Sequence, residues 1–538
     1  EEVQAFIDQG VGQLHGFWYF EAERSFRQAA ALDPDCAIAY WGMAMANVNN
    51  NKRAKQFIAE ALKRKDAAQV HESLWIDALA DFYDVKGPIA EESKPKNTKK
   101  KTEAELRKQL IKRLEGIIYD YPDDIEAKAF LGGFIWASRE KGLPITSHVA
   151  VDALLNDVLA VEPMHPAHHY RIHLWDDENS SQALNSAALC GPAAPAIAHM
   201  WHMPGHTYTK LHRYHDAAWQ QEAASRVDHA YMIRNHVIPD QIHNYAHNQE
   251  WLIRTLAICG RVHDATRLAK DMIELPRHPR YNTLGKSGTS ATFGRTRLVD
   301  LLVRFELWDE LLSLADAAYL EPSDNRQEQA KRCRALGAAC FATGAAERGE
   351  AQIDELEKLL AAAIDEGKKG SKKSSTTSDE GKDKEDASSE ESKSSEEKPD
   401  EKESKTKRSS SKKSQVVIAI EQPLEELRGR QSLAQGDATA AIAHFEKAKV
   451  GKELLSRAYL EAGNPEKAET FARQATDAAQ GQVYPLANLV DVLHRLEKPD
   501  AAANALGRLR AASATLDMDL PIIQRITPVA EENHLPAD

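Results

Sequence analysis

The sequence of 538 residues contains no run of about 20 consecutive apolar residues, so we expect no membrane-spanning helix. Its five cysteines are odd in number and widely scattered, with no CxxC pair, which argues against a disulfide framework. The HExxH motif of metalloproteases is missing, and so are serine-nucleophile and dinucleotide-binding fingerprints. Basic residues are fewer than acidic ones, 69 against 82, and the net charge of −13 argues against a protein that coats nucleic acid. We therefore expect neither a membrane nor a nucleic-acid partner.

The first residue is Glu1 rather than Met, which is expected either at an expression boundary or after removal of a leader. The compartment is left open by this, and an extracytoplasmic location is favoured over a cytoplasmic one.

Residues 365–415 lack apolar side chains, with no aromatic residue and no Leu, Ile, Val or Met. Such a segment cannot bury enough apolar surface to offset its ordering entropy, so it is predicted to be a disordered linker. Its 14 basic and 14 acidic residues cancel, so the net charge of −13 belongs to the other 487 residues. A shorter polar insertion, residues 87–103, is predicted to be an exposed loop.

The rest of the chain has the pattern of amphipathic helices, with apolar residues at i, i+3, i+4 and i+7 and almost no strand-like alternation. An internal repeat is also visible. Between Phe6 and Pro34 the residues Gly10, Ala22, Phe26 and Ala29 occupy the small and aromatic positions of a helix–turn–helix unit of about 34 residues. Similar patterns recur in five places, near Pro122, Pro163, 260–276, 436–445 and 463–475.

This recurrence resembles the tetratricopeptide repeat family, over roughly three quarters of the chain. The resemblance implies an all-α fold, a tetratricopeptide-like α-solenoid in which helix–turn–helix repeats form a right-handed superhelix. It also implies a concave groove that can bind a peptide or protein partner. The predicted organisation is a histidine-rich N-terminal array at 1–364, the disordered linker at 365–415, and further repeats at 416–538.

Histidine is abundant and unevenly distributed. Thirteen of the 21 histidines fall between His165 and His247, at positions 165, 168, 169, 173, 199, 202, 206, 212, 215, 229, 236, 243 and 247. Within this region three i, i+4 pairs place two imidazoles on one helix face: His169/His173, His202/His206 and His243/His247. The pairs start 33 and then 41 residues apart, close to the repeat length. Equivalent positions of stacked repeats lie on helices about 8–10 Å apart, so the pairs are predicted to converge in the inner groove.

Pro204 lies inside the second pair, and proline is best tolerated in the first turn of a helix. The sequence therefore predicts a helix that begins near Pro204, with His202 just before its start and His206 near its third position.

Imidazole is the commonest protein ligand for zinc, copper, iron and nickel, so the cluster predicts a transition-metal site. The nearby thioethers of Met164, Met200 and Met203 favour copper, while iron and zinc stay open. The predicted metal ligands are His169, His173, His202, His206, His243 and His247. Additional candidates, as ligands or as hydrogen-bond partners of ligands, are His165, His168, His199, Met203, Asp176 and Glu250.

The segments HMPGHTY and AHNQEWL resemble those of a histidine-bearing group of bacterial tetratricopeptide proteins of unclear activity. The matching residues are His202, Met203, Pro204, His206, Tyr208, His247 and Asn248. Glu250 stands where that group often has a further histidine, which would provide an oxygen donor at this position.

Two functions from different classes remain open. The first is a metal-binding protein, with the six histidines as ligands and oxidoreductase activity as an extension; Trp175, Trp201 and Trp251 could wall its pocket. The second is a non-catalytic scaffold that binds a peptide or protein on its concave face. A pH-sensing groove is also compatible with the pattern, and so is a purely structural role for the histidines.

Overall fold

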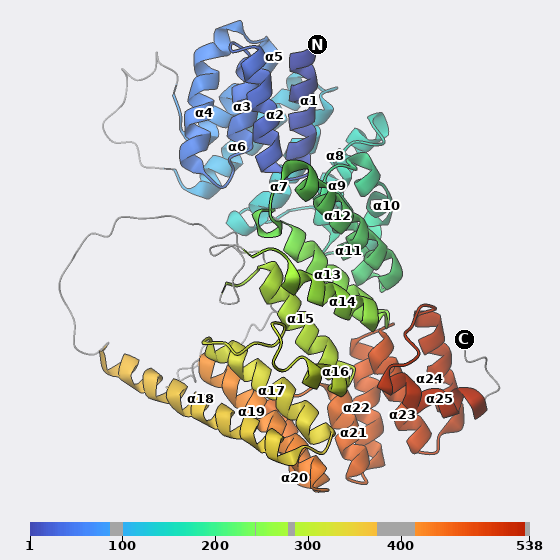
Figure 1. The fold of residues 1–538 in the computed structure, drawn as a ribbon. Coiled ribbons are helices and arrows are strands. Elements are labelled where there is room, and N and C mark those ends of the chain that lie inside the picture. Colours follow the sequence, from blue (N-terminus) through green and yellow to red (C-terminus); the bar gives the residue numbers. More distant parts are fainter. Residues whose placement is uncertain (87–100, 243, 278–285, 374–414, 533–538) are drawn as a thin grey trace, which may run out of the picture. The chain divides into compact units, whose positions relative to one another are not determined.

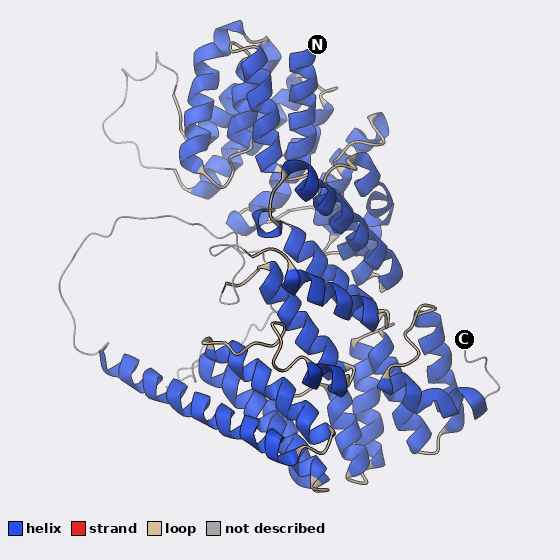
Figure 2. Cartoon of the chain, viewed as in Figure 1, coloured by secondary structure: helices blue, strands red, loops and turns tan. Residues whose placement is uncertain are grey.

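The computed structural model describes residues 1–86, 101–242, 244–277, 286–373 and 415–532. Within these ranges every regular element is a helix and none is a strand (Figure 2). The predicted all-α fold class is therefore confirmed for the part of the chain that the structure describes.

The helices follow one another with short connections. They are α1 (Glu2–His15), α2 (Tyr19–Leu32), α3 (Ala37–Met45), α4 (Asn51–Arg64), α5 (Val70–Tyr83), α6 (Glu103–Asp120), α7 (Ile125–Ser138), α8 (His148–Val161), α9 (His168–Trp175), α10 (Leu184–Ala193), α11 (Ala198–Lys210), α12 (Tyr214–Asn235), α13 (Tyr245–Ile258), α14 (Val262–Glu274), α15 (Ser290–Arg304), α16 (Trp308–Ser313), α17 (Arg326–Ala342), α18 (Ala346–Lys373), α19 (Gln415–Ala434), α20 (Ala438–Ala448), α21 (Lys452–Glu461), α22 (Pro465–Ala478), α23 (Val483–Arg495), α24 (Pro499–Ala512) and α25 (Pro521–Glu532).

Most of these helices pack as hairpins, each helix against the next one in the chain; α1 with α2, α3 with α4 and α11 with α12 are examples (Figure 1). The first helices of neighbouring hairpins also pack on each other, as α1 does on α3 and α9 on α11. Each hairpin thus covers the apolar face of its neighbour, which is the packing of a helical-repeat solenoid.

The close approach of the two helices in the first hairpin depends on Gly10. A Cβ at this position would lie 2.7 Å from the ring of Phe26, which is fully buried together with Ala22 and Ala29. The same arrangement recurs sixteen residues apart at Gly429 and Phe445, where a Cβ would lie 2.5 Å from the ring. The small and aromatic residues of the predicted repeat therefore occupy the helix–helix contacts.

The Cα positions divide the chain into two compact units. The first consists of Glu1–Leu301, Gln480–Tyr484 and Leu509–Asp517, and the second of Leu302–Ala479, Pro485–Arg508 and Met518–Asp538. These boundaries differ from the predicted division at 364 and 416, which stays a prediction. Helix α18 continues through 365–373, while 374–414 of the predicted linker and 87–100 of the predicted loop lie outside the described residues.

All five cysteines are free thiols, and four of them are buried, so the expectation of no disulfide framework is confirmed. No helix among the described residues is long and apolar enough to cross a membrane.

Candidate metal centre

Six histidines gather on three helices of the first unit, α9, α11 and α13. They form two groups of three. The ligand nitrogens of each group lie within 4.8 Å of one another, and each group contains one buried and two partly buried side chains: His169, His173 and His199 in the first group, and His202, His206 and His247 in the second. We call these groups the first and second triads.

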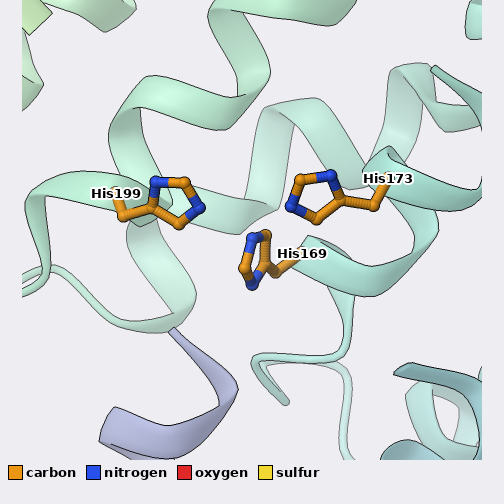
Figure 3. Close-up of side chains that lie close together, drawn as sticks. All are labelled: His169, His173 and His199. Carbon is orange, nitrogen blue, oxygen red and sulfur yellow. The ribbon is translucent and has the colours of Figure 1, made fainter. Parts of the chain in front are cut away.

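The first triad joins an i, i+4 pair on α9 to the first turn of α11. The rings of His173 and His199 face one another across the space beside His169 (Figure 3). Ring centroids are 4.6 Å apart for His169 and His173 and 4.8 Å apart for His169 and His199. The sequence pattern paired His169 with His173, and the structure adds His199 as their third neighbour.

A hydrogen bond from His169 fixes the tautomer of its ring. Nδ1–H donates to the carbonyl oxygen of His15 at 2.6 Å, one of the carbonyls that the C-terminal end of α1 leaves without a helical partner. Nε2 of His169 therefore carries a lone pair. This atom and Nε2 of His173 are buried and have no hydrogen-bond partner among the described residues. Inward-facing nitrogen lone pairs of this kind are what a metal ion requires.

Burial also keeps these imidazoles neutral. It lowers the pKa of His169 to about 4, against the opposing effect of the hydrogen bond to His15. Burial, followed by the positive charge that His169 and His199 would carry, lowers the pKa of His173 well below its usual value. At neutral pH both rings are unprotonated, as metal ligands must be.

Aromatic rings enclose the first triad. Trp136 stacks on His173 with ring centroids 4.1 Å apart, and the ring of Phe17 contacts all three histidines at centroid distances of 4.5 to 5.9 Å. Phe17 has a φ of +55°, which is unusual for a bulky residue. Four other hairpin turns have a glycine with positive φ, at 260, 344, 436 and 463. The strained backbone of Phe17 thus coincides with the placement of its ring over the histidines.

In the second triad three Nε2 atoms converge. Nε2 of His202 lies 2.9 Å from Nε2 of His206 and 3.2 Å from Nε2 of His247. The indole of Trp251 covers the group, with its centroid 4.4 Å from that of His206. Burial, followed by the neighbouring His247, lowers the pKa of His206 to about 3 and that of His202 well below its usual value. These rings are therefore also neutral at pH 7.

Gln221 orients the central ring of this triad. Nδ1–H of His202 donates to Oε1 of Gln221 at 2.6 Å, and Nε2 of Gln221 donates to the carbonyl of His202 at 3.4 Å. Gln221 follows Gly205 by sixteen residues, as Phe26 follows Gly10, and a Cβ at Gly205 would overlap the Gln221 amide. A repeat position that elsewhere carries a core aromatic ring here carries the hydrogen-bond acceptor of a histidine.

A third group, His15, Glu126 and His165, has metal-ligating residue types but is an ion-pair network. Nδ1 of His165 accepts the backbone N–H of Ala167 at 3.0 Å, so the proton of the neutral ring lies on Nε2, which donates to Glu126 at 3.3 Å. Nε2 of His15 lies 2.6 Å from the other oxygen of Glu126. Burial raises the pKa of Glu126, but the charge and hydrogen bonds of the two histidines outweigh this effect and lower it.

The other predicted candidates lie outside the triads. His168 bonds Ser186 and the carbonyl of Pro163, at 3.0 and 2.9 Å. Met203 is buried in the hydrophobic core with Met200, and Asp176 lies 3.2 Å from the ammonium of Lys210. Glu250 pairs with Arg297 at 2.6 Å. His243 lies outside the described residues, so its predicted role as a ligand stays a prediction.

The predicted start of a helix near Pro204 is wrong. Helix α11 runs from Ala198 to Lys210 with Pro204 inside it, so His202 and His206 are both helical. Packing of α11 against α10 and α12 offsets the backbone hydrogen bond that proline cannot donate. The i, i+4 geometry of this pair is therefore preserved.

None of the known protein families and none of the curated proteins compared with this sequence matches it. Similar solved structures include Naa15/Naa10 bound to HypK-THB, with 10% identity, 99% of this chain and 73% of that chain covered, and a TM-score of 0.27. The APC/C hetero-tetramer Cut9-Hcn1 has 10% identity, coverage of 98% and 96%, and a TM-score of 0.25. The human IFIT1 dimer with PPP-AAAA has 11% identity, coverage of 95% of both chains, and a TM-score of 0.27. Scores this low carry no argument, and the resemblance to histidine-bearing bacterial proteins stays a prediction.

Proposed function

We propose that this chain is a helical-repeat protein that binds a transition-metal ion through imidazole ligands carried by neighbouring hairpins. The observation that supports it most is the second triad, where Nε2 of His202 lies 2.9 and 3.2 Å from the Nε2 atoms of His206 and His247. Metal–nitrogen bonds of about 2.0–2.1 Å, at angles near 90–110°, require ligand nitrogens about 2.9–3.4 Å apart. The three side chains are thus spaced as the ligands of one ion would be.

The chemistry of the donors narrows the ion. Both triads offer neutral nitrogen, with no carboxylate in either group, which suits copper, zinc, iron or nickel rather than magnesium or calcium. Burying a cation without a compensating anion costs less for a single charge than for a double one, which favours copper in its monovalent state. The predicted contribution of methionine sulfur is not part of this argument, because Met200 and Met203 pack in the core.

Three protein ligands leave a coordination position for water or a substrate. A redox-active metal at such a position would supply electron-transfer or oxygen chemistry, and a zinc ion would supply a Lewis acid. Oxidoreductase activity is therefore the catalytic form of the proposal. The protein's own contribution would be to hold neutral imidazoles in place and to surround them with Trp251, Trp136 and Phe17.

Elemental analysis tests the proposal. The full chain, prepared without a histidine tag, is incubated with equimolar copper, zinc and iron salts and then dialysed. We expect at least one bound equivalent, lowered in His206→Ala and His247→Ala, while His229→Ala, an exposed histidine on α12, leaves it unchanged. Protein that retains no metal would contradict the proposal and leave the peptide-binding scaffold as the function to examine.

A further inference from the structure

We propose that the first triad binds a second transition-metal ion beside the first, so that the six histidines form a two-ion centre with three imidazoles on each ion. This inference rests on the proposed function and extends it from one ion to a pair. Its basis is the division of the six side chains into two separate groups that share helix α11.

One ion cannot use both triads. Two ligands of a single ion are separated by at most twice the metal–nitrogen bond, about 4.2 Å. The ligand atoms of each triad lie within 4.8 Å of one another, close enough to reach one ion by small rotations about the broad terminal torsions of histidine. The six atoms do not form one such group, so each triad would serve its own ion.

The first triad has the features of a ligand set in its own right. The hydrogen bond from Nδ1 of His169 to His15 commits that ring to coordination through Nε2. Nε2 of His169 and Nε2 of His173 are buried and lack a hydrogen-bond partner among the described residues. Burying such nitrogens is costly unless something satisfies them, and a metal ion would do so.

Helix α11 makes the two triads neighbours. His199 belongs to the first triad and His202 to the second, three residues further along the helix. Their rings are stacked with centroids 6.0 Å apart and an interplanar angle of 21°. The rings of His173 and His199 are 6.2 Å apart, so a continuous array of imidazoles runs from α9 through α11 to α13.

Ions held this close repel one another, and the repulsion is four times larger for two dications than for two monovalent ions. The groups contain no carboxylate to reduce it. Two copper(I) ions therefore fit this centre best. The repulsion also gives a measurable effect: for unit charges about 6 Å apart, an effective dielectric constant of 20 to 80 weakens the second binding step by roughly 3- to 100-fold.

The test is a competition titration of the full, tag-free chain with copper(I) and a chromogenic chelator, without oxygen and under reducing conditions. We expect two equivalents in the parent protein and one in His173→Ala and in His247→Ala. The site left in each variant should bind copper(I) roughly 3- to 100-fold more tightly than the second equivalent binds to the parent. His229→Ala should keep two equivalents, and circular dichroism shows whether each variant is folded; His199→Gln replaces His173→Ala if that variant unfolds.

The outcomes separate this inference from the proposed function. One equivalent in the parent, unchanged in His173→Ala, would overturn the second ion and leave the proposed function standing. Two equivalents whose affinities are the same in the parent and in the single-triad variants would mean independent sites, which overturns the two-ion centre. No bound copper would overturn both.

Discussion

The amide oxygen of Gln221 lies 2.6 Å from Nδ1 of His202, at the repeat position where Phe26 fills the core of the first hairpin. The scaffold and the candidate metal centre thus use the same helix–helix contact for different purposes. In the first hairpin the contact is apolar, whereas between α11 and α12 it holds a ring nitrogen in the donor state and leaves the other nitrogen as a ligand.

Replacing Gln221 with leucine should weaken metal binding. The substitution removes the acceptor that fixes the tautomer and orientation of His202, and the loss of such a partner typically lowers metal affinity by about 10- to 100-fold. The measurement is a chelator competition titration of folded protein. Gln28→Leu, at an exposed position of α2, is the control and should leave the affinity unchanged. Equal affinities in both variants would show that Gln221 does not orient a ligand.

Phe17 should be destabilising through its backbone and stabilising through its ring. Phe17→Gly removes both effects, whereas Phe17→Ala removes the ring and keeps a non-glycine residue at a φ of +55°. The glycine variant should therefore be more stable than the alanine variant by about 1 kcal/mol in urea denaturation.

Gly463→Ala is the matched control for Phe17, because it creates the same backbone strain at a φ of +69° where a Cβ meets no neighbour. It should lose about 1 kcal/mol. If Phe17→Ala were at least as stable as Phe17→Gly, the strain assigned to this turn would be absent.

Two glycines in α1 should respond in opposite ways to alanine. A Cβ at Gly10 would lie 2.7 Å from the rigid ring of Phe26, so Gly10→Ala should destabilise the protein by about 1–3 kcal/mol. A Cβ at Gly12 meets nothing within 4 Å, so Gly12→Ala should stabilise it by about 0.5–1 kcal/mol through the helix propensity of alanine. Urea denaturation measures both, and a stabilising Gly10→Ala would contradict the packing described for the first hairpin.

The pairing of Glu126 with His15 and His165 should be lost in acid. The folded-state pKa of Glu126 is lowered, so its contribution to stability is present above the unfolded pKa of about 4.5 and is lost as the pH falls below it. The parent should therefore be more stable than Glu126→Gln at pH 7, and the difference should shrink between about pH 5 and pH 3. Glu140→Gln, at an exposed carboxylate, is the control. A difference that is independent of pH would contradict the ion-pair assignment.

Local patterns were enough to predict the helical repeats. The spacing of Gly10, Ala22, Phe26 and Ala29 reports contacts within one hairpin, and these contacts are the ones observed. The i, i+4 pair on α9 was predictable for the same reason, since both residues lie on one helix face.

The remaining parts of the centre depend on contacts distant in the sequence. His15 and His169 meet although 154 residues separate them, and no local pattern links the end of α1 to α9. His199 completes the first triad because helix α11 packs against α9, a contact that the spacing of the pairs does not reveal. Gln221 could have been found by aligning Gly205 with Gly10, which exposes a polar residue at an aromatic repeat position. The position of Phe17 after Gly16 gives no indication that its ring covers histidines.

X-ray absorption of the copper-loaded protein tests the central claim most directly. We predict nitrogen scatterers at about 2.0–2.1 Å with the outer-shell scattering of imidazole, close to three per ion, and a fall in the imidazole signal per protein in His206→Ala. A first shell of oxygen or sulfur without imidazole scattering, or a spectrum that is identical in His206→Ala, would contradict a metal centre built from these histidines.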